Sequence, residues 1–400
     1  MSRSRVARVA GNIALAVVAL AWVSALMSAQ ARVTQPGDPL PGVKPREFEE
    51  FRLGLDDFLE VETAEEGLGP AFNGASCAVC HNVPAVGGVS PVAEVRAARR
   101  TAEGAFEAVA PDGETLFHLF SVPGHACQPV IPVEANVISR RVPIPLFGAG
   151  LVEAIDDDTL VALGDEQARG RDGISGRPAF ITDRATGDRR VGRFGWKAQH
   201  ATLLAFGADA YRNEMGITND LFPTEIAVGI DDARMRLCDP IPDPEDVADP
   251  RTRRRGIDNF ESFMKFLAPV GRGTIDAVAS QGEAVFDEIG CATCHVPVLS
   301  TGANANPLLH RQPVALFSDL LLHDIGTGDG IRQGAAEPDE IRTPALWGLR
   351  FRRPLLHDGS AATVDDAVRR HAGEALAARL SHARLSDAQR AALTRFLLTL

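Results

Sequence analysis

Apolar residues recur at helical spacing near both ends of the chain, with short, broken runs between them. Residues 47–61 alternate acids with apolar side chains three or four positions apart, which predicts an amphipathic helix. Residues 386–400 begin with Ser386 and Gln389 at capping-box spacing, which marks the start of another helix. Further helices are predicted over residues 156–164, 198–211, 257–267 and 275–289, and from about residue 363.

The region from about residue 89 to residue 235 has a different pattern. Its apolar runs are short, and Pro and Gly interrupt them frequently, which favours strands and turns over long helices. We therefore expect a mainly α fold with a long irregular insertion and minor β structure. The expected strands are residues 114–122, 130–142, 179–182 and 191–194.

A domain boundary is predicted after the helix over residues 257–267, because Pro269 and Gly271 end it. This gives an N-terminal domain over residues 32–268, which contains the long insertion, and a C-terminal domain over residues 269–400. Residues 1–31 lie outside both domains.

Composition limits the classes of partner. A content of 45% hydrophobic and 24% charged residues is ordinary for a globular chain with proper cores. The formal net charge of −12 argues against nucleic acid, which selects basic surfaces. The same charge favours cationic partners through electrostatic steering.

Two Cys-x-x-Cys-His motifs stand more than two hundred residues apart. Thiols three positions apart can form thioethers with the two vinyl groups of one porphyrin, and the adjacent His can coordinate the iron. The sequence therefore predicts two cytochrome c-like domains, each with a covalently bound haem c. The residues concerned are Cys77, Cys80 and His81 in the first motif and Cys291, Cys294 and His295 in the second.

A structural zinc site and a thioredoxin-like redox pair are the alternatives for these motifs. Neither explains a His directly after both cysteine pairs, and zinc ribbons usually bring their pairs close together in sequence. The two remaining cysteines, Cys127 and Cys238, are expected to form a disulfide, with two separate buried thiols as the alternative.

Residues 1–31 are interpreted as a signal peptide. Arg3, Arg5 and Arg8 precede 23 uncharged residues, 9–31, that end in Ala-Gln-Ala, a small-x-small cleavage site. An uncleaved anchor is the alternative, because this stretch is just long enough to span a bilayer. Either way we expect export to the periplasm, where bacterial haem attachment occurs, with a membrane contact only if the segment is uncleaved.

Further motifs accompany the haem signatures. They are Gly-Pro-Ala-Phe-Asn-Gly at 69–74, residues 146–155, residues 192–198, Leu-Leu-His-Asp-Ile-Gly at 321–326, residues 342–350, Leu-Leu-His-Asp-Gly-Ser at 355–360 and residues 371–374. In these motifs the chain resembles the di-haem oxidoreductase family, also described as thiol-oxidoreductase-like, in the superfamily of di-haem cytochrome c peroxidases and MauG-type enzymes. The resemblance, from about residue 45 to the C-terminus, implies a mostly α-helical fold with electron transfer between two haems.

The chain departs from that superfamily at the second haem. Its peroxidases place an axial Met just before the His-Asp/Ser-Gly motif, and MauG-type enzymes use a Tyr in that neighbourhood. The corresponding residues here are Arg353 and Leu355, and neither can serve as such a ligand. After signal removal the remaining methionines all lie outside the C-terminal domain: Met215, Met235 and Met264.

The second haem is therefore expected either to lack a sixth protein ligand or to take a His. His371, on the apolar stripe of its predicted helix, is the preferred ligand, and His357 is the alternative. A second axial His would lower the potential of this haem and make it an electron relay. His323 is the third histidine considered in this domain.

The expected function is that of an exported di-haem c-type oxidoreductase with peroxidase-like chemistry at the first haem. A non-catalytic electron carrier and a haem oxygenase acting on an apolar substrate are the alternatives. The expected partner is a small redox protein or a quinone-linked electron donor or acceptor. Calcium is considered as a further cofactor, although no motif supports it.

No catalytic residue is assigned. The acids and histidines that follow the first motif, Glu94 among them, give no means of choosing one. Core packing is the preferred interpretation of Trp196 and Trp347. If a bridge between the haems exists, it is assigned to Trp347, which lies in a motif close to the expected second haem pocket.

Overall fold

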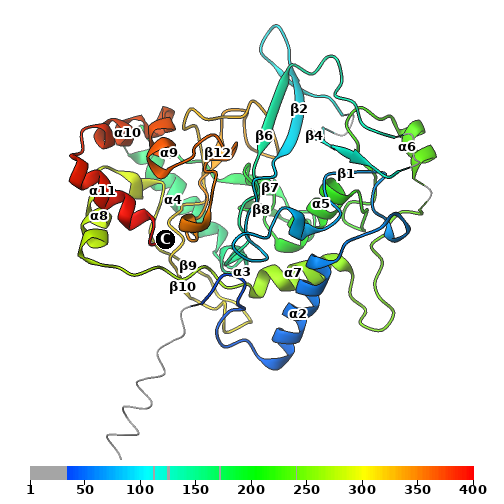
Figure 1. Cartoon of the computed structure of the whole chain (residues 1–400), viewed down its shortest axis with the longest axis horizontal. Coiled ribbons are helices and arrows are strands. Elements are labelled where there is room, and N and C mark those ends of the chain that lie inside the picture. The colour runs from blue at the N-terminus through cyan, green and yellow to red at the C-terminus, as the bar shows by residue number, and fades with distance from the viewer. Residues whose placement is uncertain (1–33, 111–112, 124–126, 171–172, 240) are drawn as a thin grey trace, which may run out of the picture.

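The computed structural model describes residues 34–110, 113–123, 127–170, 173–239 and 241–400 (Figure 1). The fold is mainly α-helical with minor β structure, as expected. Its helices are α2 (Pro45–Leu59), α3 (Ala149–Glu153), α4 (Asp157–Arg169), α5 (Leu203–Met215), α6 (Asp232–Cys238), α7 (Gly256–Phe266), α8 (Ala277–Glu288), α9 (Val364–Arg370), α10 (Leu376–Ala383) and α11 (Asp387–Leu397).

The two most extensive contacts between elements are made by helix pairs: α2 packs against α7, and α8 packs against α11 (Figure 1). A glycine lies at each contact. A Cβ atom on Gly54 would overlap the carbonyl oxygen of Asn259, and one on Gly282 would overlap that of Ala392. In both pairs the two backbones thus approach as closely as a residue without a side chain allows.

Phenylalanines fill the space beside both contacts. In the first pair, the rings of Phe58 and Phe263 are 4.9 Å apart between centroids. In the second pair, the corresponding distance between Phe286 and Phe396 is 5.3 Å. Each pair therefore has an aromatic core of its own next to one of the Cys-x-x-Cys-His motifs. The domain boundary after residue 268 stays a prediction.

The strands are short and form small antiparallel sheets. The largest sheet has β2 at its centre, paired with β3, β4 and β6. The strands are β1 (Ala71–Phe72), β2 (Glu94–Arg100), β3 (Phe106–Ala108), β4 (Leu116–Phe117), β5 (Phe120–Ser121), β6 (Val137–Arg141), β7 (Ala179–Thr182), β8 (Arg189–Gly192), β9 (Leu299–Ser300), β10 (Pro313–Val314), β11 (Leu322–His323) and β12 (Ile341–Arg342).

The central strand β2 was not predicted. It carries charged side chains and two alanines, which are poor indicators of a strand. Arg96 is nevertheless only 5% exposed, because Glu94 accepts a hydrogen bond from its Nε atom at 2.6 Å. The buried ion pair, which no local pattern reveals, makes a charged segment the centre of the sheet.

Several predicted helices have different bounds. The helix expected from residue 198 starts at Leu203, because Thr202 caps it by accepting a hydrogen bond from the amide of Ala205. The helices α3, α6 and α10 were not predicted. The capping box of Ser386 and Gln389 is confirmed at the start of α11.

The expected disulfide between Cys127 and Cys238 is confirmed. It ties the loop after β5 to the end of α6, with a Cα–Cα distance of 5.9 Å. The predicted signal peptide lies outside the described residues. Within the part of the chain that the structure describes, no helix is both long and apolar enough to cross a bilayer.

Replacing Gly54 or Gly282 by Ala should lower the free energy of unfolding by about 1–3 kcal/mol, because the added methyl group overlaps a backbone carbonyl. Gly207→Ala in α5 is the matched control. Its Cβ would lie 3.4 Å from the Met264 side chain, an ordinary contact, and alanine favours a helix by up to about 1 kcal/mol. Denaturant unfolding followed by circular dichroism measures all three. Equal stability of Gly282→Ala and Gly207→Ala would contradict the close approach.

Candidate functional site

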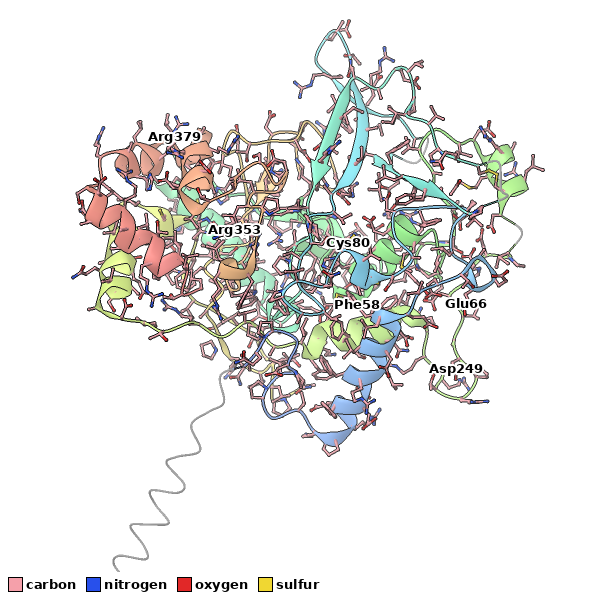
Figure 2. The ribbon with its side chains drawn as sticks, viewed as in Figure 1. Phe58, Glu66, Cys80, Asp249, Arg353 and Arg379 are labelled. Atoms are coloured by element: carbon pink, nitrogen blue, oxygen red, sulfur yellow. A yellow bond between two sulfur atoms is a disulfide. The ribbon has the colours of Figure 1, made fainter. Side chains whose placement is uncertain are left out.

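Both motifs occupy the same kind of turn, a 3₁₀ helix that follows the first helix of a packed pair. The amide of His81 donates a hydrogen bond to the carbonyl of Cys77 at 3.1 Å, and the amide of His295 donates to that of Cys291 at 3.0 Å. Figure 2 labels Phe58 and Cys80 where α2 meets the first motif. The cysteines and the histidine of the two motifs thus lie on turns of the same backbone conformation.

The imidazoles of both motifs have one nitrogen held by a backbone carbonyl. Nδ1 of His81 lies 2.9 Å from the carbonyl oxygen of Gly88, and Nδ1 of His295 lies 3.1 Å from that of Phe317. A carbonyl oxygen can only accept, so Nδ1 carries the proton and Nε2 keeps a lone pair. This is the tautomer and orientation that an axial iron ligand needs.

Burial keeps both imidazoles neutral. It lowers the pKa of His81 and, with the charge of His371 as the next cause, lowers the pKa of His295 to about 4. Both rings pack beside a phenylalanine, with centroid distances of 6.1 Å from His81 to Phe58 and 6.3 Å from His295 to Phe286. Neutral imidazoles in apolar surroundings fit iron coordination.

The motif thiols do not resemble those of a zinc or redox site. Burial raises the pKa of Cys77, Cys80 and Cys291 to about 12, whereas a redox-active thiol has a lowered pKa. Among the described residues, no potential metal-binding group combines the two cysteine pairs, so the motifs do not share a zinc site. The chemistry of these donors fits covalent haem better.

A cavity of about 280 Å³ lies at the second motif. Cys291, Cys294 and His295 line it, together with His357 and His371. The rest of its wall is largely apolar, which suits a porphyrin. Apolar residues in the wall include Phe286, Ile289, Leu346, Leu349, Leu393 and Leu397.

His371 is not on the stripe of a helix, as was expected, because α9 ends one residue before it. His371 caps this helix, and its Nδ1 atom lies 2.7 Å from the carbonyl oxygen of Ala367. The same reasoning as for the motif histidines leaves Nε2 with a lone pair. His371 thus shares with His81 and His295 the arrangement that suits an iron ligand.

The other two histidines considered as ligands, His323 and His357, have different surroundings. The ring nitrogens of His323 lie 2.9 Å from Asp319 and 2.9 Å from Glu374. Although burial opposes it, these hydrogen bonds and one with Cys294 raise the pKa of His323 to about 12, so both nitrogens are protonated and cannot bind iron. His357 is 4% exposed, lines the cavity and stacks edge-on with Trp196 at 6.1 Å.

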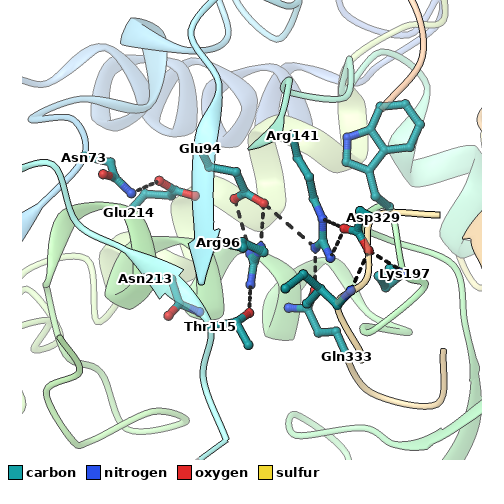
Figure 3. A network of polar contacts seen from close by, with 12 residues as sticks. Asn73, Glu94, Arg96, Thr115, Arg141, Lys197, Asn213, Glu214, Asp329 and Gln333 are labelled. Atoms are coloured by element: carbon teal, nitrogen blue, oxygen red, sulfur yellow. Dashed lines mark hydrogen bonds and ion pairs between the residues drawn. The ribbon is translucent and has the colours of Figure 1, made fainter. Parts of the chain in front are cut away.

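A pair of carboxyl groups near the first motif was not identified from the sequence. A hydrogen bond joins Glu94 and Glu214, and both contribute to raising the pKa of Cys80. Burial, followed by the charge of Glu94, raises the pKa of Glu214 to about 8. Although burial opposes ionisation, Arg96 and Arg141 lower the pKa of Glu94 (Figure 3). At neutral pH, one carboxyl therefore holds a proton and the other is an anion.

Glu94 also begins a buried chain of charges (Figure 3). Arg141 lies 3.9 Å from Glu94 and 2.7 Å from Asp329, which in turn lies 3.0 Å from Lys197. The side chains of Arg141, Asp329 and Lys197 are at most 2% exposed. Trp196, next in sequence to Lys197, lines the cavity at the second motif, so this chain of charges runs from the first motif towards the second.

The two tryptophans differ in position. The indole Nε1 of Trp196 donates to the carbonyl of Val142 at 2.8 Å, and its ring lines the cavity. Trp347 is the residue assigned to a bridge between the haems. It packs against Gly148, in the hydrophobic cluster that also contains Phe263, and it is not part of the cavity wall. The motif that contains Trp347 did not indicate whether its side chain would face the cavity or the hydrophobic core.

Acids also gather at one place away from the motifs. The carboxylates of Glu225, Asp239, Asp243 and Glu245 offer oxygens within 4.8 Å of one another. Burial raises the pKa of Glu225 to about 10 and that of Glu245 to about 7, with repulsion from neighbouring acids contributing to both shifts. Protons alone can thus offset this charge, and calcium stays a prediction.

Comparison with known proteins places the chain among haem proteins. Residues 131–400 match the model of a family described as "Di-haem oxidoreductase, putative peroxidase". No curated protein matches the chain. Among solved structures, hydrazine synthase of Kuenenia stuttgartiensis is 16% identical and has a TM-score of 0.43, with 93% of this chain and 97% of that chain covered.

Two further solved structures are similar at the same level. The diheme peroxidase BthA from Burkholderia thailandensis is 16% identical, with a TM-score of 0.42 and coverage of 92% of this chain and 89% of that chain. A MauG-like protein associated with microbial copper homeostasis is 17% identical, with a TM-score of 0.33 and coverage of 70% and 95%, respectively.

Proposed function

Because the chain belongs to the di-haem oxidoreductase family, we propose that it is an exported c-type protein that transfers electrons between two covalently bound haems. The observation that carries this proposal is the shared arrangement of the two motifs. In each, two protonated thiols accompany an imidazole whose Nδ1 is held by a backbone carbonyl and whose Nε2 is free. Such a set can hold one haem by two thioethers and an axial nitrogen.

A haem bound at each motif would supply a one-electron redox centre. His81 and His295 would hold the iron atoms from one side. At the second motif His371 lies in the same cavity as His295, with its own Nε2 free, and would complete the coordination. The second haem would then be an electron relay without an open position.

Peroxidase-like chemistry at the first haem is supported by the pair of Glu94 and Glu214. Cleavage of a peroxide bond requires a group that moves a proton between the two oxygens. Glu214 can release its proton while Arg96 and Arg141 keep the charge of Glu94 balanced. This proton donor, close to the first motif and not the second, favours an enzyme over a simple electron carrier.

The location and partners follow from the same proposal. Thioether attachment and the disulfide between Cys127 and Cys238 both suit the periplasm, which residues 1–31 would direct the chain to enter. The partner would be a small redox protein or a quinone-linked donor or acceptor. The net charge of −12 would favour a cationic one.

Replacing both cysteines of one motif by Ala should remove one of two covalent haems. We expect Cys77→Ala/Cys80→Ala and Cys291→Ala/Cys294→Ala each to halve the haem stain that remains on the denatured protein. The Cys127→Ser/Cys238→Ser variant is the control and should keep both haems. Full staining of either motif variant, or no stain on the natural protein, would contradict covalent attachment.

The His371→Ala variant should convert the second haem from low spin to high spin, because its iron loses a nitrogen ligand. The oxidised absorption spectrum and cyanide binding measure this change. His357→Ala should leave both unchanged. If His357→Ala instead opens the iron while His371→Ala has the natural spectrum, His357 is the ligand.

Glu214→Gln should reduce the rate of peroxide reduction by about 10²–10⁴-fold, because the amide keeps the shape of the side chain but cannot transfer the proton. The exposed Glu103→Gln is the matched control and should have the natural rate. Haem stain confirms that both haems are present. A Glu214→Gln rate equal to that of the control would remove the peroxidase proposal and leave the electron carrier.

A further inference from the structure

Two arginines in the wall of the cavity at the second motif are buried. Arg342 is 4% exposed and Arg352 is 6% exposed, and both line the cavity together with His295. Within the described residues, neither arginine forms an ion pair. Burial lowers the pKa of both to about 10, although the charge of Asp319 acts in the opposite direction on Arg342. An arginine is rarely buried in this way unless an anion accompanies it, because its charge loses the solvation of water.

Hydrogen bonds to neutral groups orient both guanidinium groups. Arg342 donates to the carbonyl of Gly195 at 2.8 Å and to that of Thr343 at 3.1 Å. Arg352 donates to the carbonyl of Ala345 at 3.1 Å. These acceptors supply no negative charge, and a guanidinium has more N–H donors than these bonds use. The arrangement is ready for a planar, anionic acceptor such as a carboxylate.

The other charges of the wall do not supply that anion. Asp319 and Glu374 both accept hydrogen bonds from His323, so one imidazolium is shared between two carboxylates. A third arginine of the wall, Arg379 in α10, is half-buried (Figure 2). The wall and Asp319 together present four cations and two anions: His323, Arg342, Arg352, Arg379, Asp319 and Glu374.

These six groups together carry an excess of two positive charges. A haem carries two propionate carboxylates on one edge of a porphyrin that is otherwise apolar. The apolar part of the wall suits the porphyrin, and the charge excess equals the charge of the two propionates.

We propose that Arg342 and Arg352 bind the propionate groups of the haem at the second motif and thereby set its potential. The inference rests on the proposed function, since it requires a haem at His295. The positive guanidinium groups offset the propionate charge, which favours the reduced haem over the oxidised one. These arginines are positioning residues that raise the potential of the relay.

The test compares Arg342→Gln and Arg352→Gln with Arg353→Gln in the full di-haem protein. Arg353 is adjacent in sequence but exposed, so its loss removes the same charge where solvent screens it. Haem stain comes first, followed by a spectroscopic redox titration of the second haem. We expect each buried variant to lower the ratio of reduced to oxidised haem about tenfold at a fixed potential, which corresponds to about 59 mV. Arg→Lys variants should restore most of the ratio.

The outcomes separate the two proposals. No second haem on the natural protein would overturn the proposed function and this inference with it. A loaded haem whose ratio in both Gln variants equals that of Arg353→Gln would overturn the inference alone. If a Gln variant does not attach the haem, attachment and a natural potential in the Lys variant support the charge role. If neither the Gln variant nor the Lys variant attaches the haem, the arginine has only a structural role and the inference is overturned.

Discussion

The hydrogen bond between Nδ1 of each motif histidine and a backbone carbonyl is the constraint that gives both sites their chemistry. It places the proton on one nitrogen and leaves the other free to bind iron. The carbonyls of Gly88 and Phe317 must therefore be held in place. Backbone hydrogen bonds between Val83 and Val89 fix the loop that carries Gly88, and the aromatic core of the second helix pair fixes Phe317. Phe317 itself packs against Phe396 of α11, with ring centroids 5.8 Å apart. The close packing of the helix pairs at their glycines consequently helps to position the groups that orient the motif histidines.

The two sites share this constraint, but their surroundings differ. The first motif lies near a hydrogen-bonded pair of carboxyl groups, Glu94 and Glu214. The second opens into a largely apolar cavity in which His371 has the same tautomer as His295. Proton transfer is thus available at one site, and a second nitrogen ligand at the other. The difference between the sites arises from the insertion and from the segment that ends α9, since the motif turns are alike.

Local patterns were sufficient for features with a short sequence signal. The capping box at Ser386, the two motifs and the family could all be predicted because neighbouring residues define them. The disulfide was predicted because Cys127 and Cys238 were the only cysteines left. The strand β2 and the role of Glu214 could not be found in this way, because both depend on pairing between residues far apart in sequence. The pairing of Glu214 with Glu94 appears only when α5 folds beside the first motif.

Buried charge is the feature that local patterns conceal most. Hydrophobic periodicity treats Arg96, Arg141 and Lys197 as solvent-exposed positions, yet each lies in the interior with an acid that offsets its charge. Arg342 and Arg352 are buried about as deeply, but within the described part of the chain neither forms an ion pair. The fold supplies an ion-pair partner to each of the first three cations. The lack of one for the two arginines therefore points to an anion that the polypeptide does not provide. Haem is an anion of that kind, and it would complete the charge balance of the C-terminal interior.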